Sequence, residues 1–121
     1  MKNKAGFTLI ELIVSVTIIA VLTVIGVISY AGASQKARDG RRVADLEKIR
    51  IALELYRQNV GSYPASLTDL ETEYMQQLPV GPKGEDYGTD YTATAFTYTI
   101  DVVVESAGTS NVPGYYEVKN P

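Results

Sequence analysis

The sequence FTLIELIVSVTIIAVLTVIG, residues 7–26, decides the architecture, because it is almost entirely apolar yet carries one carboxylate, Glu11. No charged side chain occurs between residues 12 and 35, and the run from Leu12 to Ala33 can cross a hydrocarbon layer as a helix of about 20 residues. A lone carboxylate in hydrocarbon is energetically costly. We therefore expect a membrane helix in which Glu11 has a partner.

The composition excludes several classes of function. A chain of 121 residues supports about one domain, and the apolar run leaves only a small soluble remainder. The sequence contains no Cys and no His, which excludes disulfides, thiolate and imidazole metal sites, Ser-His-Asp triads and Cys-His nucleophiles. No other group of acid, base and nucleophile is evident, so we do not expect an enzyme.

Charge is distributed unevenly along the chain, whose formal net charge is −3. Residues 36–60 carry seven Lys or Arg against four acids, a net of +3, whereas residues from 61 onward carry two Lys against nine acids, a net of −7. Such an asymmetry indicates an interaction surface, or two surfaces that fit each other.

The helical period continues beyond the apolar run. Apolar residues recur at spacings of three and four between charged ones, which predicts one long helix whose second half is amphipathic: Val43, Leu46, Ile49, Leu53, Tyr56 and Val60. Gly61 can adopt the left-handed cap conformation and Pro64 prevents continuation, so we expect the helix to end there.

A short second helix and a small sheet are expected after this point. Thr68 and Glu71 form the pattern of a capping box, and the inward positions would be Leu67, Leu70, Tyr74 and Leu78. A Pro- and Gly-rich loop spans residues 78–88.

The period then changes to two, which is typical of a half-buried strand with Phe96, Tyr98, Ile100, Val102 and Val104 on one face. Residues 87–92 are expected to pair with it and residues 114–118 to add a third strand. The predicted fold class is α+β, a long N-terminal helix packed on a small antiparallel sheet.

The segment KAGFTLIELIVSVTIIAVLTVIG, residues 4–26, resembles the type III signal sequence of type IV pilins and pseudopilins. In that family a short basic leader ends in Gly, Phe follows, and a Glu lies four residues further on, which here are Gly6, Phe7 and Glu11. The resemblance implies a cleaved leader at residues 1–6, a hydrophobic transmembrane and assembly helix at 7–34, and a globular head at 35–121 that includes the amphipathic half of the helix.

The resemblance also implies chemistry for these three residues. A prepilin peptidase would cut between Gly6 and Phe7, and the new amine of Phe7 would commonly be methylated. That cationic amine could neutralise Glu11 of a neighbouring subunit, so that the carboxylate sets the register of assembly. The alternative is that Glu11 is an exposed carboxylate favoured by the helix macrodipole.

Partners and location follow from the same resemblance. The implied partners are further copies in a helical filament, the prepilin peptidase, a membrane platform with an assembly ATPase, and membrane lipid before assembly. The precursor would lie in the inner membrane of a bacterium, and the filament would reach the cell surface or span the periplasm. Basic residues flank the span on both sides, so the orientation rests on the resemblance rather than on the positive-inside rule.

One other class of function remains as an alternative. A monomeric single-pass membrane protein that displays a binding head would have the same composition. The nine tyrosines could stack on nucleic acid, but they more simply fill a small sheet, so binding of DNA has no support.

The basic cluster after the apolar run is a candidate contact between subunits. Because the apolar stripe should face its own sheet, we expect Arg38, Arg41 and Arg42 to point away and to meet acidic head residues of neighbours, such as Glu85 and Asp86. The alternative is a solvated turn that faces lipid headgroups.

Calcium is the one metal that the carboxylates suggest, since some secretion pseudopilins bind it through loop carboxylates near the C-terminus. The candidates here are Asp86, Asp90, Asp101 and Glu105. Their spacing matches no EF-hand and the sequence lacks an Asp-rich final loop, so solvated carboxylates are favoured and we expect no cofactor. Many pilins also carry a helix proline and a C-terminal disulfide, both of which are missing here.

Overall fold

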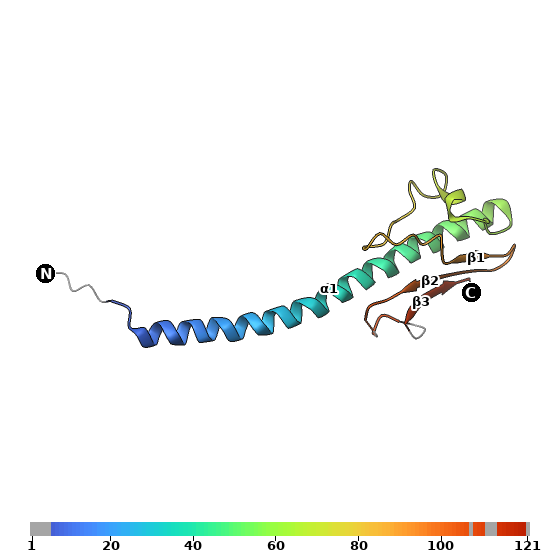
Figure 1. Ribbon diagram of the computed structural model, residues 1–121. Coiled ribbons are helices and arrows are strands. Elements are labelled where there is room, and N and C mark those ends of the chain that lie inside the picture. The colour runs from blue at the N-terminus through green and yellow to red at the C-terminus, as the bar shows by residue number, and fades with distance from the viewer. Residues whose placement is uncertain (1–5, 107, 111–113, 121) are drawn as a thin grey trace. The chain divides into compact units, whose positions relative to one another are not determined.

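The computed structural model describes residues 6–106, 108–110 and 114–120. Its elements are helix α1 (Leu9–Val60), the 3-10 helix η1 (Leu67–Leu70), and the strands β1 (Tyr91–Ala93), β2 (Tyr98–Val103) and β3 (Tyr115–Lys119), shown in Figure 1. The chain divides into two compact units, residues 1–34 and 35–121, and the second unit contains the sheet. These elements confirm the predicted α+β class.

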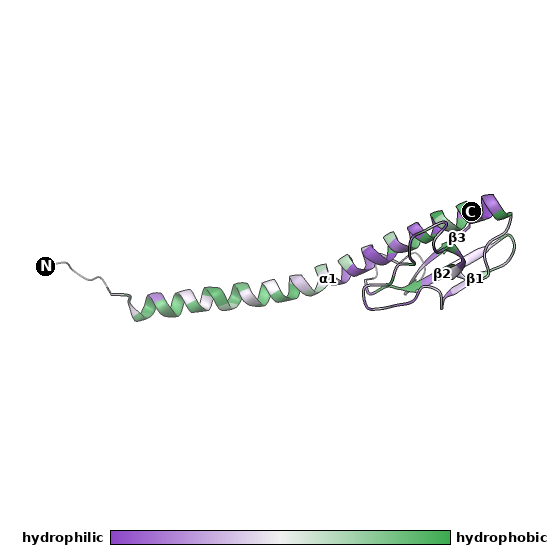
Figure 2. Ribbon diagram, turned by 90° about the horizontal axis from the view of Figure 1, so that it is seen from above, coloured by the Kyte–Doolittle hydropathy of each residue, from purple (hydrophilic) through white to green (hydrophobic). Residues whose placement is uncertain are grey.

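The part of α1 in the first unit is apolar on most sides, which Figure 2 shows as mainly green with pale patches. α1 is the one helix in the described residues that is long and apolar enough to cross a membrane, judged by length and composition. The hydroxyls of Ser15, Thr17 and Thr23 donate to the backbone carbonyls four residues earlier, at 2.7–2.8 Å. These groups therefore need no water, as a lipid environment requires.

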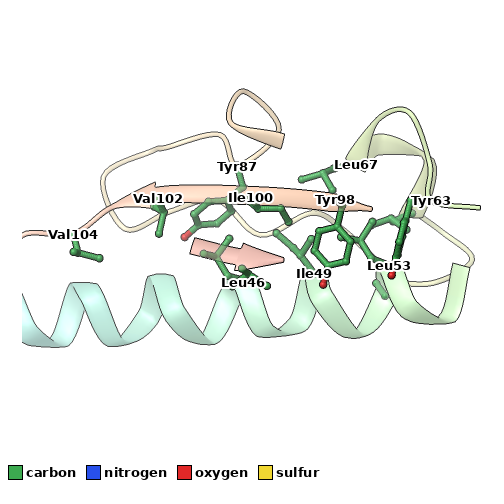
Figure 3. Packing of buried hydrophobic residues seen from close by; sticks show 13 residues of the cluster. Leu46, Ile49, Leu53, Tyr63, Leu67, Tyr87, Tyr98, Ile100, Val102 and Val104 are labelled. Atoms are coloured by element: carbon green, nitrogen blue, oxygen red, sulfur yellow. The ribbon is translucent and has the colours of Figure 1, made fainter. Parts of the chain in front are cut away.

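In the second unit one stripe of α1 packs against the sheet. Figure 3 shows Leu46, Ile49 and Leu53, all fully buried, facing Tyr98 and Ile100 of β2. The strands form an antiparallel sheet in the order β1-β2-β3, and inward residues alternate with outward ones along β2. The expected inward positions are confirmed for Leu46, Ile49 and Leu53 of the helix and for alternate residues of β2, and these supply most of the core. Val60, also expected inward, is 56% exposed because it is the last residue of the helix.

The end of α1 is also confirmed. The helix ends at Val60, and Gly61 adopts a φ of 91° while its N–H donates to the carbonyl of Arg57 at 2.8 Å. A left-handed residue at this position satisfies a carbonyl that the helix would otherwise leave open.

The cap of η1 was placed wrongly from the sequence. The capping box consists of Ser66 and Asp69, because Ser66 is extended and its hydroxyl accepts from the N–H of Thr68, whereas Glu71 follows the last turn. Thr68 therefore lies inside η1. The inward placement of Leu67 and Leu70 is confirmed, since both are buried.

The strand boundaries differ from the prediction at one end. Phe96 is 67% exposed, because it lies in the turn between β1 and β2, where backbone and hydroxyl hydrogen bonds between Thr94 and Thr97 close the turn before β2 begins at Tyr98. Tyr87 precedes β1 and is buried. The third strand is confirmed as β3.

Candidate processing and assembly site

The candidate site comprises Gly6, Phe7, Thr8 and Glu11. Gly6 to Thr8 precede the first turn of α1, and all four residues are exposed. The Gly6–Phe7 peptide bond therefore lies outside regular structure, where a peptidase could reach an extended backbone. The rest of the predicted leader, residues 1–5, lies outside the described residues.

Glu11 is held by Thr8. The N–H and the hydroxyl of Thr8 both donate to Oε2 of Glu11 at 3.0 Å, and the N–H of Glu11 donates to the Thr8 hydroxyl at 3.3 Å. This reciprocal arrangement fixes the start of the helix and satisfies donors that have no partner within the helix. Sequence reasoning missed Thr8, although the T-x-x-E spacing at residues 8–11 was a readable signal.

The two interpretations of Glu11 concern different states of the molecule. In the single chain Glu11 lies in the first turn of α1, where the helix macrodipole favours a carboxylate, as the alternative interpretation expected. Both donors of Thr8 use the same oxygen of Glu11, so within the described part of the chain Oε1 is open to a further donor. A contact with a neighbour's amine is geometrically compatible with the cap and stays a prediction.

A second group of polar residues lies in the head, where α1 meets the segment after β2. The guanidinium of Arg42, whose side chain is 2% exposed, contacts Asp39 at 2.8 Å, Glu105 at 3.0 Å, and Glu85. Arg38 contacts Glu105 at 2.6 Å and Lys83 contacts Glu105 at 3.1 Å. We call these six residues the ionic cluster.

Asp39 connects the ionic cluster to the backbone. Its carboxylate accepts the N–H groups of Glu105 and Ser106 and the hydroxyl of Ser106, at 2.6–3.1 Å. Burial alone would raise the pKa of Asp39, but these donors and Arg42 lower it. Hydrogen bonding to Arg38 likewise holds the pKa of Glu105 well below its usual range. The carboxylates of the cluster are therefore ionised at neutral pH.

This arrangement overturns part of the predicted subunit contact. Arg38 and Arg42 do not point away from the head, because residues 38, 39 and 42 continue the inward side of α1 that Leu46 and Ile49 occupy further along. Arg42 and Glu85 do meet, but within one chain.

The remaining residues of that prediction are exposed or locally engaged. The side chain of Arg41 is 64% exposed and lies 3.8 Å from Asp45, so a role for Arg41 between subunits stays a prediction. Asp86 does not contact this helix in any described interaction; its Oδ1 accepts the N–H of Gly88 at 2.8 Å.

The four calcium candidates do not form a cation site in the described residues. Glu105 is engaged by three cationic side chains, and Asp86 closes a local turn. Asp90 and Asp101 are neighbours through a backbone hydrogen bond of 3.4 Å, but no group of three or more acidic side chains in the described ranges is arranged to hold a metal. The described residues therefore give no support to calcium, the less favoured alternative, and its binding is untested.

An exposed Gly-Phe bond, a Glu in the first turn of an apolar helix and an α+β head define the class of pilin-like filament subunits. Residues 1–27 match the family model of the prokaryotic N-terminal methylation motif. The chain is 30% identical over 118 residues to type II secretion system core protein G of Vibrio cholerae, covering 84% of this chain and 80% of the relative. It therefore belongs to the family of type II secretion core protein G.

Other relatives agree. The proteins of the same name from Klebsiella pneumoniae and Escherichia coli are each 30% identical, covering 72% and 70% of this chain and 74% and 70% of their own lengths. No solved structure matches the chain.

The family model and the relatives together show what the protein is. It is a structural subunit of a type IV pilus or pseudopilus filament, processed by prepilin peptidase and assembled through its N-terminal helix. It is a bacterial protein anchored in the inner membrane by that helix.

Proposed function

We propose that this chain builds a periplasm-spanning pseudopilus of a bacterial type II secretion system, rather than a surface pilus. The observation that carries the proposal is the extent of the similarity to the Vibrio cholerae secretion protein, which covers 84% of this chain. A match of that length includes most of the head, whereas the methylation motif covers only residues 1–27. The similarity to secretion proteins is therefore not confined to the segment that the methylation motif describes.

In this proposal the peptidase cuts the exposed bond between Gly6 and Phe7, and the amine of Phe7 is methylated. Removal of Lys2 and Lys4 changes the side-chain charge from −3 to −5, since two positive charges are lost. The new amine of one subunit approaches the open Oε1 of Glu11 in the next. Because an ammonium and a carboxylate both lose hydration in the apolar bundle, each is strongly disfavoured in any register that leaves it unpaired.

The remaining partners are supplied by the secretion machinery. A membrane platform and an assembly ATPase extract the subunit from lipid and add it to the filament, and the subunit itself catalyses no reaction. The apolar part of α1 exchanges lipid contacts for contacts with other copies, so its hydrophobic surface stays out of water in both states.

Two measurements test the proposal. Intact-mass analysis of the membrane-extracted protein should give a chain that begins at a methylated Phe7, and a mature chain that still begins at Met1 would contradict processing at this site. Deletion of the gene should abolish export of secreted enzymes into the medium while surface pili remain unchanged. Loss of surface pili with normal export would instead assign the chain to a pilus.

A further inference from the structure

The head part of α1 carries a second stripe that faces away from the sheet. Its residues recur at spacings of three and four, all of them are exposed, and we call them the outer helix stripe: Arg41, Ala44, Lys48, Ile51 and Leu55. Ile51 is 61% exposed, so the stripe ends in apolar surface on which nothing of this chain packs in the described residues.

The outer helix stripe carries an excess of positive charge. Arg41 and Lys48 lie on either side of Asp45, with ion-pair distances of 3.8 Å and 2.9 Å. Both cations pair with the same carboxylate, so one of the two positive charges is left unbalanced. The cations are exposed whereas Asp45 is buried, so the surface of the stripe is positive. Such a surface attracts a partner of negative charge.

The outer face of the sheet has the opposite character. Asp101 of β2 lies directly opposite Glu117 of β3, and Val103 lies directly opposite Tyr115, two residues further along. Cross-strand partners project from the same face of a sheet, so one carboxylate pair and one apolar pair are adjacent there. Val103 is 61% and Tyr115 47% exposed. We call these four residues the outer sheet face.

The acids of the outer sheet face are only partly balanced by Lys119, which lies opposite Thr99 on the same face of the sheet. Two carboxylates directly opposite each other destabilise a strand pair. Lys119 contacts Glu117 at 3.4 Å, whereas none of the described interactions pairs a cation with the side chain of Asp101. Burial, Glu117 and Asp90 together raise the pKa of Asp101, so its ionised form is disfavoured in the single chain.

We propose that the outer helix stripe of one copy docks on the outer sheet face of a second copy, with Lys48 near Asp101 and with Ile51 and Leu55 on Val103 and Tyr115. This inference rests on the proposed filament and adds a contact between heads to the assembly through N-terminal helices. In this contact the cation of Lys48 lies near the carboxylate of Asp101. The apolar residues that follow on each element, on the helix and on the sheet, then meet as well, so the two surfaces are complementary in both charge and hydrophobicity.

The spacing along the two elements is compatible with this contact. Two residues along a strand cover about 7 Å, which separates the carboxylate pair from the apolar pair. Along α1, Lys48 is about 4.5 Å from Ile51 and about 10 Å from Leu55. The contact joins two different surfaces, so it does not close into a symmetric dimer and can repeat in an open helical array, as a filament requires.

The test uses cysteine pairs, because the chain has no native Cys to interfere. Full-length Ile51→Cys and Val103→Cys are produced together in cells that carry the assembly machinery, and the sheared filaments are oxidised. Most of the disulfide-linked dimers should join residue 51 of one copy to residue 103 of the other. A matched mixture replaces Val103→Cys with Val80→Cys, which is similarly exposed but outside the outer sheet face, and its yield should be at least about tenfold lower.

Charge reversal supplies the second arm. Lys48→Glu and Asp101→Lys should each lower the yield of the 51–103 dimer several-fold, and the two changes combined should restore most of it. Normal filaments without this dimer would overturn the inference and leave the proposed function intact, whereas failure of unaltered protein to form filaments would overturn the proposed function.

A third arm excludes a metal ion as the occupant. Dimer yield should be unchanged by chelation with EDTA and by added calcium. If EDTA abolishes the dimer while Lys48→Glu leaves it unchanged, a cation rather than a second copy occupies the acidic pair, and the inference is wrong.

Discussion

The two parts of α1 obtain their stability from different sources. Between residues 9 and 34 almost every side chain is exposed and apolar, and the described hydrogen bonds of side chains include the cap between Thr8 and Glu11 and three hydroxyls that donate to the helix backbone. Between residues 35 and 60 one side of the helix is buried, and it carries ion pairs as well as apolar residues. The same helical backbone thus presents an exposed apolar surface in its first part and packs against the sheet in its second part.

The comparison shows which part of the chain covers its own apolar surface. The second unit buries its own apolar stripe and pairs Arg42 with carboxylates, so its core is formed within a single copy. The first unit presents its whole apolar surface to lipid or to other copies, because no part of its own unit covers it. Substitutions in the first part should therefore affect assembly, and substitutions of the inward residues of the second part should affect folding.

The largest effect is expected at Gly6. Replacing Gly6 with Leu should block the peptidase and leave nearly all of the protein as precursor, because a branched side chain would stand beside the bond to be cut. Intact-mass measurement of membrane extracts separates precursor from mature chain. Gly26→Leu is a matched control on a position where an added side chain also meets open space, and it should be processed normally. Normal processing of Gly6→Leu would remove the assigned cleavage site.

The next effect concerns Glu11. Glu11→Val should insert into the membrane as well as the unaltered chain but should reduce filament yield by about tenfold or more, because the neighbour's amine loses its counter-charge. Thr8→Val removes the hydroxyl while keeping the carboxylate and should reduce yield less. Quantifying sheared filaments against membrane-bound subunit gives both values. Equal filament yields for Glu11→Val and the unaltered chain would leave only the capping role.

In the head the largest destabilisation is expected from Arg42→Met. The change leaves Asp39 buried beside an apolar side chain, and breaking a buried ion pair in this way costs about 3 kcal/mol. Arg41→Met removes a cation that is 64% exposed and should change the stability by less than about 0.5 kcal/mol. Thermal unfolding of both full-length variants in detergent distinguishes them. Equal losses would mean that the ionic cluster does not stabilise the head.

The stability of the head should also depend on pH. The pKa values of Asp39, Glu85 and Glu105 are lowered in the folded chain by their hydrogen-bond donors and cations. Carboxylates of this kind contribute their full stability above their unfolded pKa of about 4, and the contribution is lost as pH falls through the lower folded values. The unfolding temperature should therefore fall below about pH 4. In Arg42→Met this dependence should be weaker, and an identical pH profile would contradict the assignment.

The smallest effect is expected at Asp101 and has the opposite sign. Asp101→Asn relieves repulsion from Glu117 and should stabilise the isolated subunit by about 0.5 kcal/mol at neutral pH. The same change should weaken filaments if Lys48 of a neighbour contacts Asp101. Unfolding in detergent and resistance of sheared filaments to salt measure the two effects separately. A filament that becomes more stable together with the subunit would count against docking on this face.

The sequence predicted the parts of this molecule that depend on periodicity. The membrane part needed only length and apolarity, and the inward positions of α1 and β2 followed from periods of about 3.6 and 2. The pattern at residues 6, 7 and 11 predicts a processing site, because those residue types at that spacing are specific, and the match of residues 1–27 to the methylation motif agrees with the family. The boundaries of the strands were predicted less accurately. β2 begins at Tyr98 rather than Phe96, because hydrogen bonds between Thr94 and Thr97 close a turn there, and periodicity does not report such contacts.

The ionic cluster could not be predicted from the sequence. Charged residues are usually solvated, so Arg38 and Arg42 were expected to turn outward. Both arginines pair with Glu105, and Arg42 also pairs with Asp39, whose carboxylate accepts backbone N–H groups of Glu105 and Ser106, more than sixty residues away in sequence. A pattern of charge cannot show which distant backbone N–H groups a carboxylate will reach. Thr8 was a different case, because its role as a cap was local and readable.

The bonds of Asp39 also have a mechanical consequence. In a filament assembled through its N-terminal helix, a load on the subunit runs along α1, and Asp39 ties α1 to the backbone of Glu105 and Ser106. Several short bonds on one carboxylate share such a force and must break together, whereas a row of bonds opened one by one yields at a lower load. Asp39 would then transmit tension from α1 to the segment that follows β2. Asp39→Ala should lower the rupture force of a single subunit pulled along α1 in a force-spectroscopy experiment. An unchanged rupture force would mean that the load passes through other contacts.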